Sequence, residues 1–263
     1  MVMLKINENR CLTSFLLGRK CVYCGHRKAC RTKRGYRKCY YCRRQKSLKR
    51  LKREILVISA FRRQQTALLT SQDTGFPYKA VKRIYDHLRL AIIRQCEQEA
   101  GRMSGEIELD EAYFGGRRKG KRGRGAAGKS VVFGLLERDG RVYTKVVDAV
   151  SKEILMDVIR RKSRKGSVYY TDKFRSYNSL KRYGKHYTLN HSKTFVRKGR
   201  KRSVHINGIE GFWSFAKHGL YNYRGVSRSM FSLYLKEMEY RYNHRKENLL
   251  NLLIRLYFGY ELT

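Results

Sequence analysis

The sequence contains no run of about 18 apolar residues, the least that a membrane-spanning helix requires. Its N-terminal segment, MVMLKINENRCLTSFLLG, has only a short apolar stretch and an early acidic residue, so we expect no secretory signal. These two absences predict a protein that works inside the cell and has no membrane partner.

Acidic residues are also scarce: 21 Asp and Glu stand against 61 Lys and Arg, and the formal net charge is +40. Self-repulsion of this size destabilises a compact chain unless a polyanion neutralises it. The basic residues extend over the whole length among 20 Tyr and 11 Phe, which excludes a basic tail on a neutral domain. The pattern indicates a long path for nucleic acid. On charge alone, a structural RNA-binding protein is the alternative.

Cysteines are confined to one end of the chain, since six of the seven precede residue 43. In a basic chain expected inside the cell, they indicate metal binding rather than disulfides. Two Cys-x2-Cys pairs, separated by residues 25–38, can close a tetrahedral structural zinc site, and so short a segment could hardly fold without one. The predicted ligands of one Zn²⁺ are Cys21, Cys24, Cys39 and Cys42.

Other residues near these pairs leave alternatives open. His26 and Cys30 are spare candidates as ligands, whereas Cys11 and Cys96 are expected to be ordinary thiols. A disordered basic arm without metal is the competing interpretation of the segment. Because many Lys and Arg residues surround the cysteines, we interpret residues 1–50 as a DNA-binding zinc ribbon.

Residues 51–100 have apolar positions at helical spacing, interrupted by the turn-forming sequence SQDTGFP. The helix–break–helix pattern over residues 62–92 resembles a helix–turn–helix, whose second helix would contact DNA. A plain helical linker is the alternative. The proposed contact residues are Tyr78, Lys79, Lys82 and Arg83.

Residues 101–263 change to a mixed pattern of strands and helices. Three consecutive strands are predicted at EIELDEAYFGG, SVVFGLLERDG and RVYTKVVDAV, followed by a helix at SKEILMDVIRRKS. A strand at GSVYYTD, a helix around FRSYNSLKRY, a short strand at HYTLN and terminal helices complete the order. This order predicts an α/β fold with a mixed sheet flanked by helices. In the Gly-rich basic loop 117–129, the proposed DNA contacts are Arg118, Lys119 and Lys121.

Three carboxylates are placed where this fold can bring them together. Asp110 lies inside the first strand, Asp172 ends the strand GSVYYTD, and Glu210 lies early in the helix VHINGIEGFWSFAKHG. Phosphodiester transfer uses two divalent cations about 3.5–4 Å apart, and Mg²⁺ or Mn²⁺ prefers carboxylate ligands. One strand Asp alone is more often an edge or turn residue. All three in this order, in so basic a chain, favour a metal-dependent catalytic site.

Together these motifs resemble the zinc-ribbon DDE transposases of bacterial insertion sequences, the ISXO2-like group, to which Merlin-type transposons are related. The resemblance covers nearly the whole chain. Its motifs are the ribbon, D-E-x-Y-x-G-G from Asp110, T-D-x-x-x-x-Y from Thr171, H-x-N-x-I-E-x-F-W-x-x-x-K from His205, and EYRYNHR from Glu239. It implies an RNase H-like catalytic domain that hydrolyses DNA at the transposon ends and joins the freed 3′-hydroxyl to target DNA.

Residue by residue, the resemblance assigns the first two acids to Asp110 and Asp172. The third position varies in this family, and Asn207 competes with Glu210 for it. We favour Glu210 because a charged ligand holds a second cation better than an amide. Lys217, at i+7 from Glu210, matches the basic residue expected to contact phosphate, with a solvated surface lysine as the alternative. The single tryptophan, Trp213, is expected to pack in the core rather than to stack on a base.

The expected partners are double-stranded DNA, as transposon ends and as target, and further copies of the chain assembled on it. The expected location is on DNA, in a bacterial cytoplasm and nucleoid or in a eukaryotic nucleus. Two rival functions remain: a DNA-binding regulator with a degenerate nuclease fold, and a structural RNA-binding protein.

DNA binding is predicted to depend steeply on salt, because each phosphate that a Lys or Arg neutralises releases counterions. The logarithm of affinity, measured by fluorescence anisotropy against the logarithm of salt concentration, should fall with a slope of about −0.9 per phosphate contacted. Shortening loop 117–129 should flatten this slope without changing the preference for terminal repeats. A response to salt that is flat in the intact chain contradicts the prediction.

Overall fold

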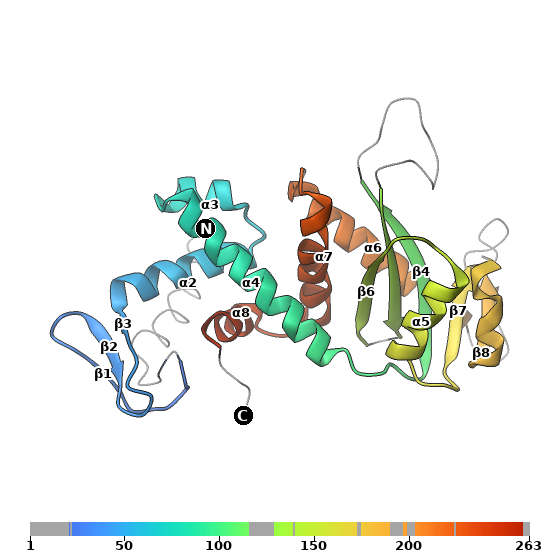
Figure 1. The fold of residues 1–263 in the computed structure, drawn as a ribbon, viewed down its shortest axis with the longest axis horizontal. Coiled ribbons are helices and arrows are strands. Elements are labelled where there is room, and N and C mark those ends of the chain that lie inside the picture. Colours follow the sequence, from blue (N-terminus) through green and yellow to red (C-terminus); the bar gives the residue numbers. More distant parts are fainter. Residues whose placement is uncertain are drawn as a thin grey trace. The chain divides into compact units, whose positions relative to one another are not determined.

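The computed structural model describes residues 21, 23–115, 129–138, 140–172, 175–189, 197–198, 203–223 and 225–259. Internal contacts divide the chain into two units (Figure 1). The helical unit comprises Met1–Ile92 and His244–Thr263, and the sheet unit comprises Ile93–Asn243. Within the described residues, no helix combines the length and the apolarity that crossing a membrane demands.

The helical unit begins with a small antiparallel sheet that carries the cysteines, followed directly by helices. Ser47 ends the sheet and caps the first helix, because its side chain accepts a hydrogen bond from the N–H of Arg50. The elements are β1 (Ala29–Arg31), β2 (Tyr36–Cys39), β3 (Gln45–Ser47), α2 (Leu48–Arg62), α3 (Ala67–Thr74), α4 (Tyr78–Glu99) and α8 (Leu249–Phe258). Helix α8 packs on α2, and α4 continues beyond Ile92 into the sheet unit.

The predicted helix–break–helix is present in α3 and α4. Thr66 caps α3, and Gly75 ends it in the left-handed conformation at φ 66°, which glycine adopts without strain. The hydroxyl groups of Thr70 and Tyr85 form a buried hydrogen bond of 2.8 Å that joins the two helices. The second helix therefore leaves the turn at a defined angle, with its first residues exposed to solvent.

The sheet unit is built on five strands in the order β6-β5-β4-β7-β8. The three consecutive strands predicted from the sequence pair antiparallel, and β7 and β8 run parallel to β4. The expected α/β class, a mixed sheet flanked by helices, is confirmed. The strands are β4 (Glu106–Phe114), β5 (Ser130–Glu137), β6 (Val142–Val147), β7 (Val168–Asp172) and β8 (Lys185–Leu189).

Helices cover both faces of this sheet (Figure 1). Because side chains alternate along a strand, the even-numbered Ala112 and Phe114 of β4 share one apolar cluster with α6 and α7. The odd-numbered Ile107 and Leu109 share the other cluster with α5 and η1. The covering elements are α5 (Lys152–Lys162), η1 (Arg175–Arg182), α6 (Asn207–Leu220) and α7 (Arg228–Asn243). Two short strands, β9 (Arg197–Lys198) and β10 (Ser203–Val204), and the 3₁₀ turn η2 (Tyr221–Tyr223) were not predicted.

The helix expected around FRSYNSLKRY is a 3₁₀ helix rather than an α-helix. Tyr177 and Leu180 are both fully buried against the sheet. They lie three residues apart, and a helix with three residues per turn puts both on the same side. The 3₁₀ helix thus points both of these large side chains toward the sheet.

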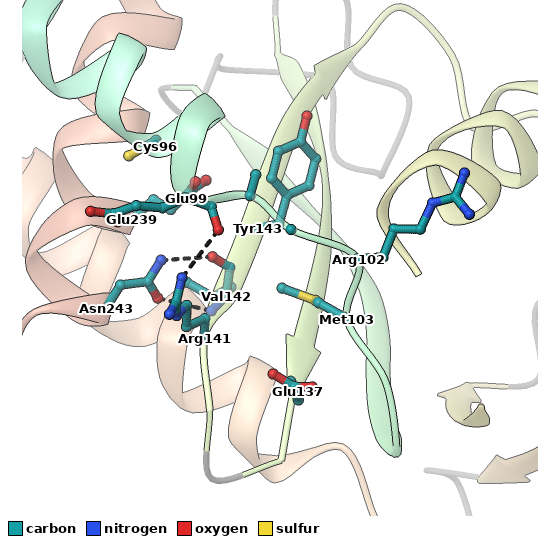
Figure 2. Close-up of a pocket in the computed structure, with 12 residues that line it drawn as sticks. Cys96, Glu99, Arg102, Met103, Glu137, Arg141, Val142, Tyr143, Glu239 and Asn243 are labelled. Atoms are coloured by element: carbon teal, nitrogen blue, oxygen red, sulfur yellow. Dashed lines mark hydrogen bonds between the residues drawn. The ribbon is translucent and has the colours of Figure 1, made fainter. Parts of the chain in front are cut away.

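Strand β6 lies at an edge of the sheet, and side chains of α7 cover that edge (Figure 2). Glu239 accepts hydrogen bonds from the N–H (2.7 Å) and hydroxyl (2.6 Å) of Thr144. Asn243, one helical turn further, exchanges two 2.9 Å hydrogen bonds with the backbone of Val142. The EYRYNHR motif therefore includes residues that satisfy backbone groups which a neighbouring strand would otherwise pair.

Helix α6 approaches the sheet closely at Gly134, the partner of Asp110 in the β4–β5 pair. A Cβ at this position would lie 2.6 Å from Cζ2 of Trp213 and 2.9 Å from Cδ1 of Ile209. Such distances are far below van der Waals contact, so no side chain fits there unless α6 moves. The glycine therefore determines how deeply Trp213 packs beside Asp110.

Gly134→Ala is predicted to destabilise the sheet unit by about 1–3 kcal/mol, the usual cost of overpacking a core. The matched control is Gly211→Ala on the exposed face of α6, where an added Cβ meets nothing within 4 Å. That change should stabilise by about 0.5–1 kcal/mol, because glycine in a helix interior is unfavourable. Urea unfolding followed by the emission of the single tryptophan measures both. Equal effects of the two substitutions would contradict the packing described.

Candidate active site and candidate zinc site

Two of the predicted acids lie at the same level on neighbouring strands. In the parallel pairing of β4 with β7, Glu108 is the partner of Tyr170, and Asp110 and Asp172 each follow two residues later. Residues two positions apart on a strand point to the same face of the sheet. Both side chains therefore belong to the face that α6 covers. Asp110 itself pairs with Gly134 on its other side.

The third predicted acid lies on the helix above them. Glu210 is in the first turn of α6 and is exposed, and Trp213 follows it by one turn. The indole Nε1 of Trp213 donates a 3.1 Å hydrogen bond to Oδ2 of Asp110. The expected core position of Trp213 is confirmed, since its side chain is buried. The sequence alone did not reveal this hydrogen bond to the first acid.

The three carboxylates influence one another electrostatically. Burial and, to a smaller extent, the negative charges of Asp172 and Glu210 raise the pKa of Asp110 to about 6. Hydrogen bonds from the backbone N–H of Glu111 and from Trp213 act in the opposite direction. A half-buried carboxylate held near two others is costly, and a bound cation would remove that cost.

The three carboxylates do not form one tight cluster. Among the described residues, only the four cysteines bring three or more ligand atoms within 4.8 Å of one another. Two cations about 3.5–4 Å apart can be held by carboxylates that do not touch, because each ligand binds from a different side. The hard oxygen donors and the raised pKa of Asp110 both fit Mg²⁺ or Mn²⁺.

Tyr177 of the T-D-x-x-x-x-Y motif supports the strand from the opposite face. Its buried hydroxyl donates a hydrogen bond to the carboxylate of Glu111. Burial, together with the charges of Glu111, Asp110 and Asp172, raises the pKa of Tyr177 well above its ordinary value. Tyr177 is therefore a neutral donor that holds Glu111 on the far side of the sheet from α6.

Sequence reasoning missed the residues that hold the start of α6. Glu108 is 1% exposed, forms an ion pair with Arg138 and accepts a hydrogen bond from the N–H of Ile209. A signal was available: Glu106, Glu108 and Asp110 alternate along β4, and a charged residue facing a helix needs a partner. Nothing local in the sequence pointed to Arg138.

The other residues predicted on α6 are exposed. Asn207 begins the helix, and its side chain faces solvent, as that of Glu210 does. The Nζ of Lys217 lies 5.9 Å from the centre of the Phe114 ring, which is on the same face of β4 as Asp110. Lys217 is thus beyond the acids along the strand and open to a ligand.

The four cysteines of the predicted ribbon converge as expected. Sγ of Cys21 lies 3.7 Å from that of Cys42, and Sγ of Cys24 lies 3.7 Å from that of Cys39. A tetrahedral zinc with bonds of about 2.3 Å separates its sulfur ligands by about 3.8 Å. The tetrad therefore has the size of a zinc site.

Both knuckles end in the same backbone conformation. Gly25 follows Cys24 at φ 70°, and Arg43 follows Cys42 at φ 59°, a left-handed conformation that is uncommon for a residue with a Cβ. The spare candidates lie outside the tetrad: Cys30 is on β1, and His26 stacks on Tyr41 at 4.8 Å. The expected ordinary thiol at position 96 is buried near the backbone carbonyl of Lys236.

The predicted DNA contacts on α4 are exposed at the start of that helix: Tyr78, Lys79, Lys82 and Arg83. Lys82 forms an ion pair with Asp86 one turn later, at 2.5 Å. The remaining predicted contacts, Arg118, Lys119 and Lys121, lie outside the described residues.

A cavity of about 240 Å³ lies at the β6 edge, apart from the candidate active site (Figure 2). Its walls include Glu99, Arg141 and Tyr143 together with the α7 residues that cover the edge. None of the three predicted acids lines it. The helical unit has a larger groove of about 590 Å³ between α2 and α4, lined mainly by apolar and basic side chains together with Glu54.

Comparison with known proteins identifies a family, which matches within the sheet unit, and two similar proteins. The family described as ISXO2-like transposase domain matches residues 102–243. An uncharacterized transposase-like protein of Haemophilus influenzae is 41% identical over 105 residues, which are 40% of this chain and 82% of that protein. An uncharacterized protein in transposable element ISH50 of Halobacterium salinarum is 26% identical over 168 residues, 57% of this chain and 56% of that protein.

Solved structures of Mos1 transposase are more distant. A Mos1 transposase paired-end complex with the left transposon end has 11% identity and a TM-score of 0.33, covering 77% of this chain and 78% of that one. The Mos1 strand transfer complex has 11% identity and a TM-score of 0.30, covering 78% of each chain. Likeness at this level adds no weight to either fold or function.

Removal of one cysteine tests the zinc site. Cys39→Ser should abolish zinc binding and unfold the ribbon, because a structural zinc supplies much of the folding energy of so small a module. Cys30→Ser, outside the tetrad, should leave one zinc per chain. Elemental analysis of reduced protein and limited proteolysis of residues 21–47 measure both. Wild-type protein that purifies without zinc contradicts the assignment.

Asp110→Asn is predicted to stabilise the metal-free protein at neutral pH. Asp110 has a pKa of about 6 when folded, against 3.8 ordinarily, so ionisation penalises folding at pH 7 by up to about 3 kcal/mol. The penalty is fully present above about pH 6 and is lost as the pH falls below 3.8, where the unfolded state is protonated as well. We therefore expect a gain of about 1–3 kcal/mol at pH 7 that shrinks as the pH falls.

Thermal unfolding of Asp110→Asn and wild type across this pH range, in chelator, measures the gain. Exposed Asp148 provides the control, since Asp148→Asn should change little. A loss of stability in Asp110→Asn at pH 7 would show that the carboxylate is stabilised by contacts rather than penalised by burial.

Proposed function

Since the chain belongs to the family of ISXO2-like transposase domains, we propose that it is an active DNA transposase. It binds the terminal inverted repeats of its element, hydrolyses phosphodiester bonds there with divalent cations, and joins the freed 3′-hydroxyl to target DNA. Asp110, Asp172 and Glu210 hold the cations.

One observation supports the catalytic assignment above the others. Asp110 and Asp172 are level on adjacent parallel strands, and the helix that covers them carries Glu210 in its first turn. The raised pKa of Asp110, to which both other acids contribute, supports their closeness. The resemblance to the family assigns Asp110 and Asp172 as the first two acids, and the geometry of the two strands supports that assignment.

The chain's own residues divide the work. When bound, Mg²⁺ or Mn²⁺ supplies positive charge that stabilises the attacking and leaving oxygens of an in-line displacement. Trp213 fixes the orientation of Asp110 through its Nε1 hydrogen bond, as partners of metal ligands commonly do. Lys217, exposed beyond the acids, contacts a DNA phosphate near the cut. Asp110 must be ionised to act as a cation ligand, and a bound cation favours the ionised form.

DNA binding extends over the helical unit. The zinc ribbon and the exposed basic residues at the start of α4 contact the terminal repeat. The charge of +40 supplies the non-specific part of the affinity. Copies of the chain assemble on the paired transposon ends.

The decisive test separates cutting from binding. Asp110→Ala, Asp172→Ala and Glu210→Ala should each lower cleavage of repeat-ended DNA by roughly 100-fold or more, since removing one preorganised electrostatic partner already costs about that much. DNA affinity should persist or rise, because a negative charge near phosphate is removed. Asp148→Ala, a change at an exposed carboxylate, is the control and should cut normally.

Different failures point to different rivals. Near-full cleavage by Glu210→Ala, with none by Asn207→Ala, would make the amide the third ligand. Cleavage unaffected by Asp110→Ala and Asp172→Ala would rule out the mechanism. Specific DNA binding without any metal-dependent cutting by wild type would favour a regulator, and a preference for RNA would favour a structural RNA-binding protein.

A further inference from the structure

Helix α6 starts without a cap from its own sequence. Its N-cap residue is Ile206, and no side chain at that position accepts a hydrogen bond from the first turn. Helices usually satisfy these N–H groups with a Ser, Thr, Asp or Asn side chain just before the helix. Here the N–H of Ile209 donates to Oε2 of Glu108 at 2.9 Å, from a strand 101 residues earlier in the chain.

Glu108 is well suited to this task. A carboxylate at a helix N-terminus is favoured by the helix dipole, and hydrogen bonds to an ionised acceptor are strong. Burial of an unpaired carboxylate would be costly, but Arg138 Nε donates to its other oxygen at 3.1 Å. The pair therefore places a neutralised, rigid acceptor at the position where α6 begins.

Arg138 holds the same helix start by a second route. Its Nη2 donates to the backbone carbonyl of His205 at 2.8 Å, just before α6. Its Nη1 bonds Glu106 at 2.7 Å, and its guanidinium lies 3.7 Å from the centre of the Tyr170 ring. Strands β4 and β7 thus hold the arginine, and the arginine holds the segment leading into the helix.

The second residue of the helix is Gly208, and the fit requires it. A Cβ there would lie 2.8 Å from Oε2 of Glu108 and 3.0 Å from Cδ2 of Leu136. Any side chain would displace the carboxylate that caps Ile209. Gly211, one turn later on the exposed face of the helix, has no neighbour within 4 Å of an added Cβ.

We infer that Glu108, clamped by Arg138, is a positioning residue that sets where α6 begins on the sheet and hence the reach of Glu210 toward Asp110 and Asp172. Glu210 directly follows the capped Ile209. A helix that slipped by one residue would turn by about 100° and rise by about 1.5 Å, which would carry Glu210 away from the acids. The inference rests on the proposed role of Glu210 as a cation ligand.

Binding of Mn²⁺ to the full, zinc-loaded chain tests this directly. Trp213 is the only tryptophan and its indole contacts Asp110, so quenching of its emission by paramagnetic Mn²⁺ reports binding at that site. Glu108→Gln and Gly208→Ala should raise the Mn²⁺ concentration at half-quenching about 10- to 100-fold, the usual effect of changing a partner of metal ligands. Asp148→Asn and Gly211→Ala are the matched controls, one at an exposed carboxylate outside the clamp and one on the same helix. Both should stay near the wild-type midpoint.

A merely structural role would lower the urea midpoint of the variants and leave the Mn²⁺ midpoint of the folded molecules unchanged. Wild-type Mn²⁺ midpoints in both Glu108→Gln and Gly208→Ala therefore overturn the inference. If neither variant folds, Arg138→Lys decides in the same assay: it keeps the charge but cannot bond Glu108 and His205 together. A raised midpoint then supports the clamp, and an unchanged one overturns it.

Asp110→Asn and Glu210→Gln, measured in parallel, separate this inference from the proposed function. If these two leave the Mn²⁺ midpoint unchanged, the cation site itself is misassigned. If they raise it and the Glu108 variant does not, only the positioning role fails.

Discussion

The seating of α6 on β4 is the contact on which the rest of the sheet unit depends. Three features of the sheet hold it: the carboxylate of Glu108 caps the helix, Asp110 accepts the indole hydrogen bond of Trp213, and Gly134 on β5 leaves room for that indole. Each is polar or steric rather than simply apolar, so the helix has one favoured position rather than a range of equivalent ones. That matters for catalysis, because carboxylates on two strands and a helix serve one pair of cations only if the helix is held within a fraction of an ångström.

The same arrangement is costly before a cation binds. A carboxylate that is half-buried beside two others has its pKa raised, so the folded chain carries a penalty at neutral pH that a neutral residue would remove. Strain of this kind is typical of functional sites, where stability is given up for a prepared geometry. The wider chain has the opposite imbalance, a net charge of +40, which DNA would neutralise. Both imbalances are relieved by the ligands of the proposed reaction, divalent cations in one case and phosphates in the other.

Local patterns in the sequence predicted the strands and the cysteine tetrad. They did not predict the contacts between residues far apart in the chain. Alternation of apolar residues gave the three antiparallel strands and the one that ends at Asp172, and the Cys-x2-Cys spacing gave the tetrad, because both signals lie within a few neighbouring residues. The cap of Ile209 by Glu108 joins positions 101 residues apart, and the packing of α8 on α2 joins the two ends of the chain. The spacing of apolar residues along the sequence does not predict such long-range contacts. Trp213 illustrates both cases. Its burial could be predicted from its size and apolarity, whereas its hydrogen bond to Asp110 depends on where α6 lies on the sheet.

The central claim is that Asp110, Asp172 and Glu210 surround one cation site, and local backbone cutting by bound iron measures this most directly. Fe²⁺ takes the place of Mg²⁺ at oxygen-rich sites, and with ascorbate and peroxide it generates hydroxyl radicals that cleave the nearest peptide backbone. In zinc-loaded protein the account predicts cuts at three places, the middle of β4, the end of β7 and the first turn of α6, and their loss in Asp110→Asn. Cuts that are absent from these segments, or that persist unchanged in Asp110→Asn, would contradict it.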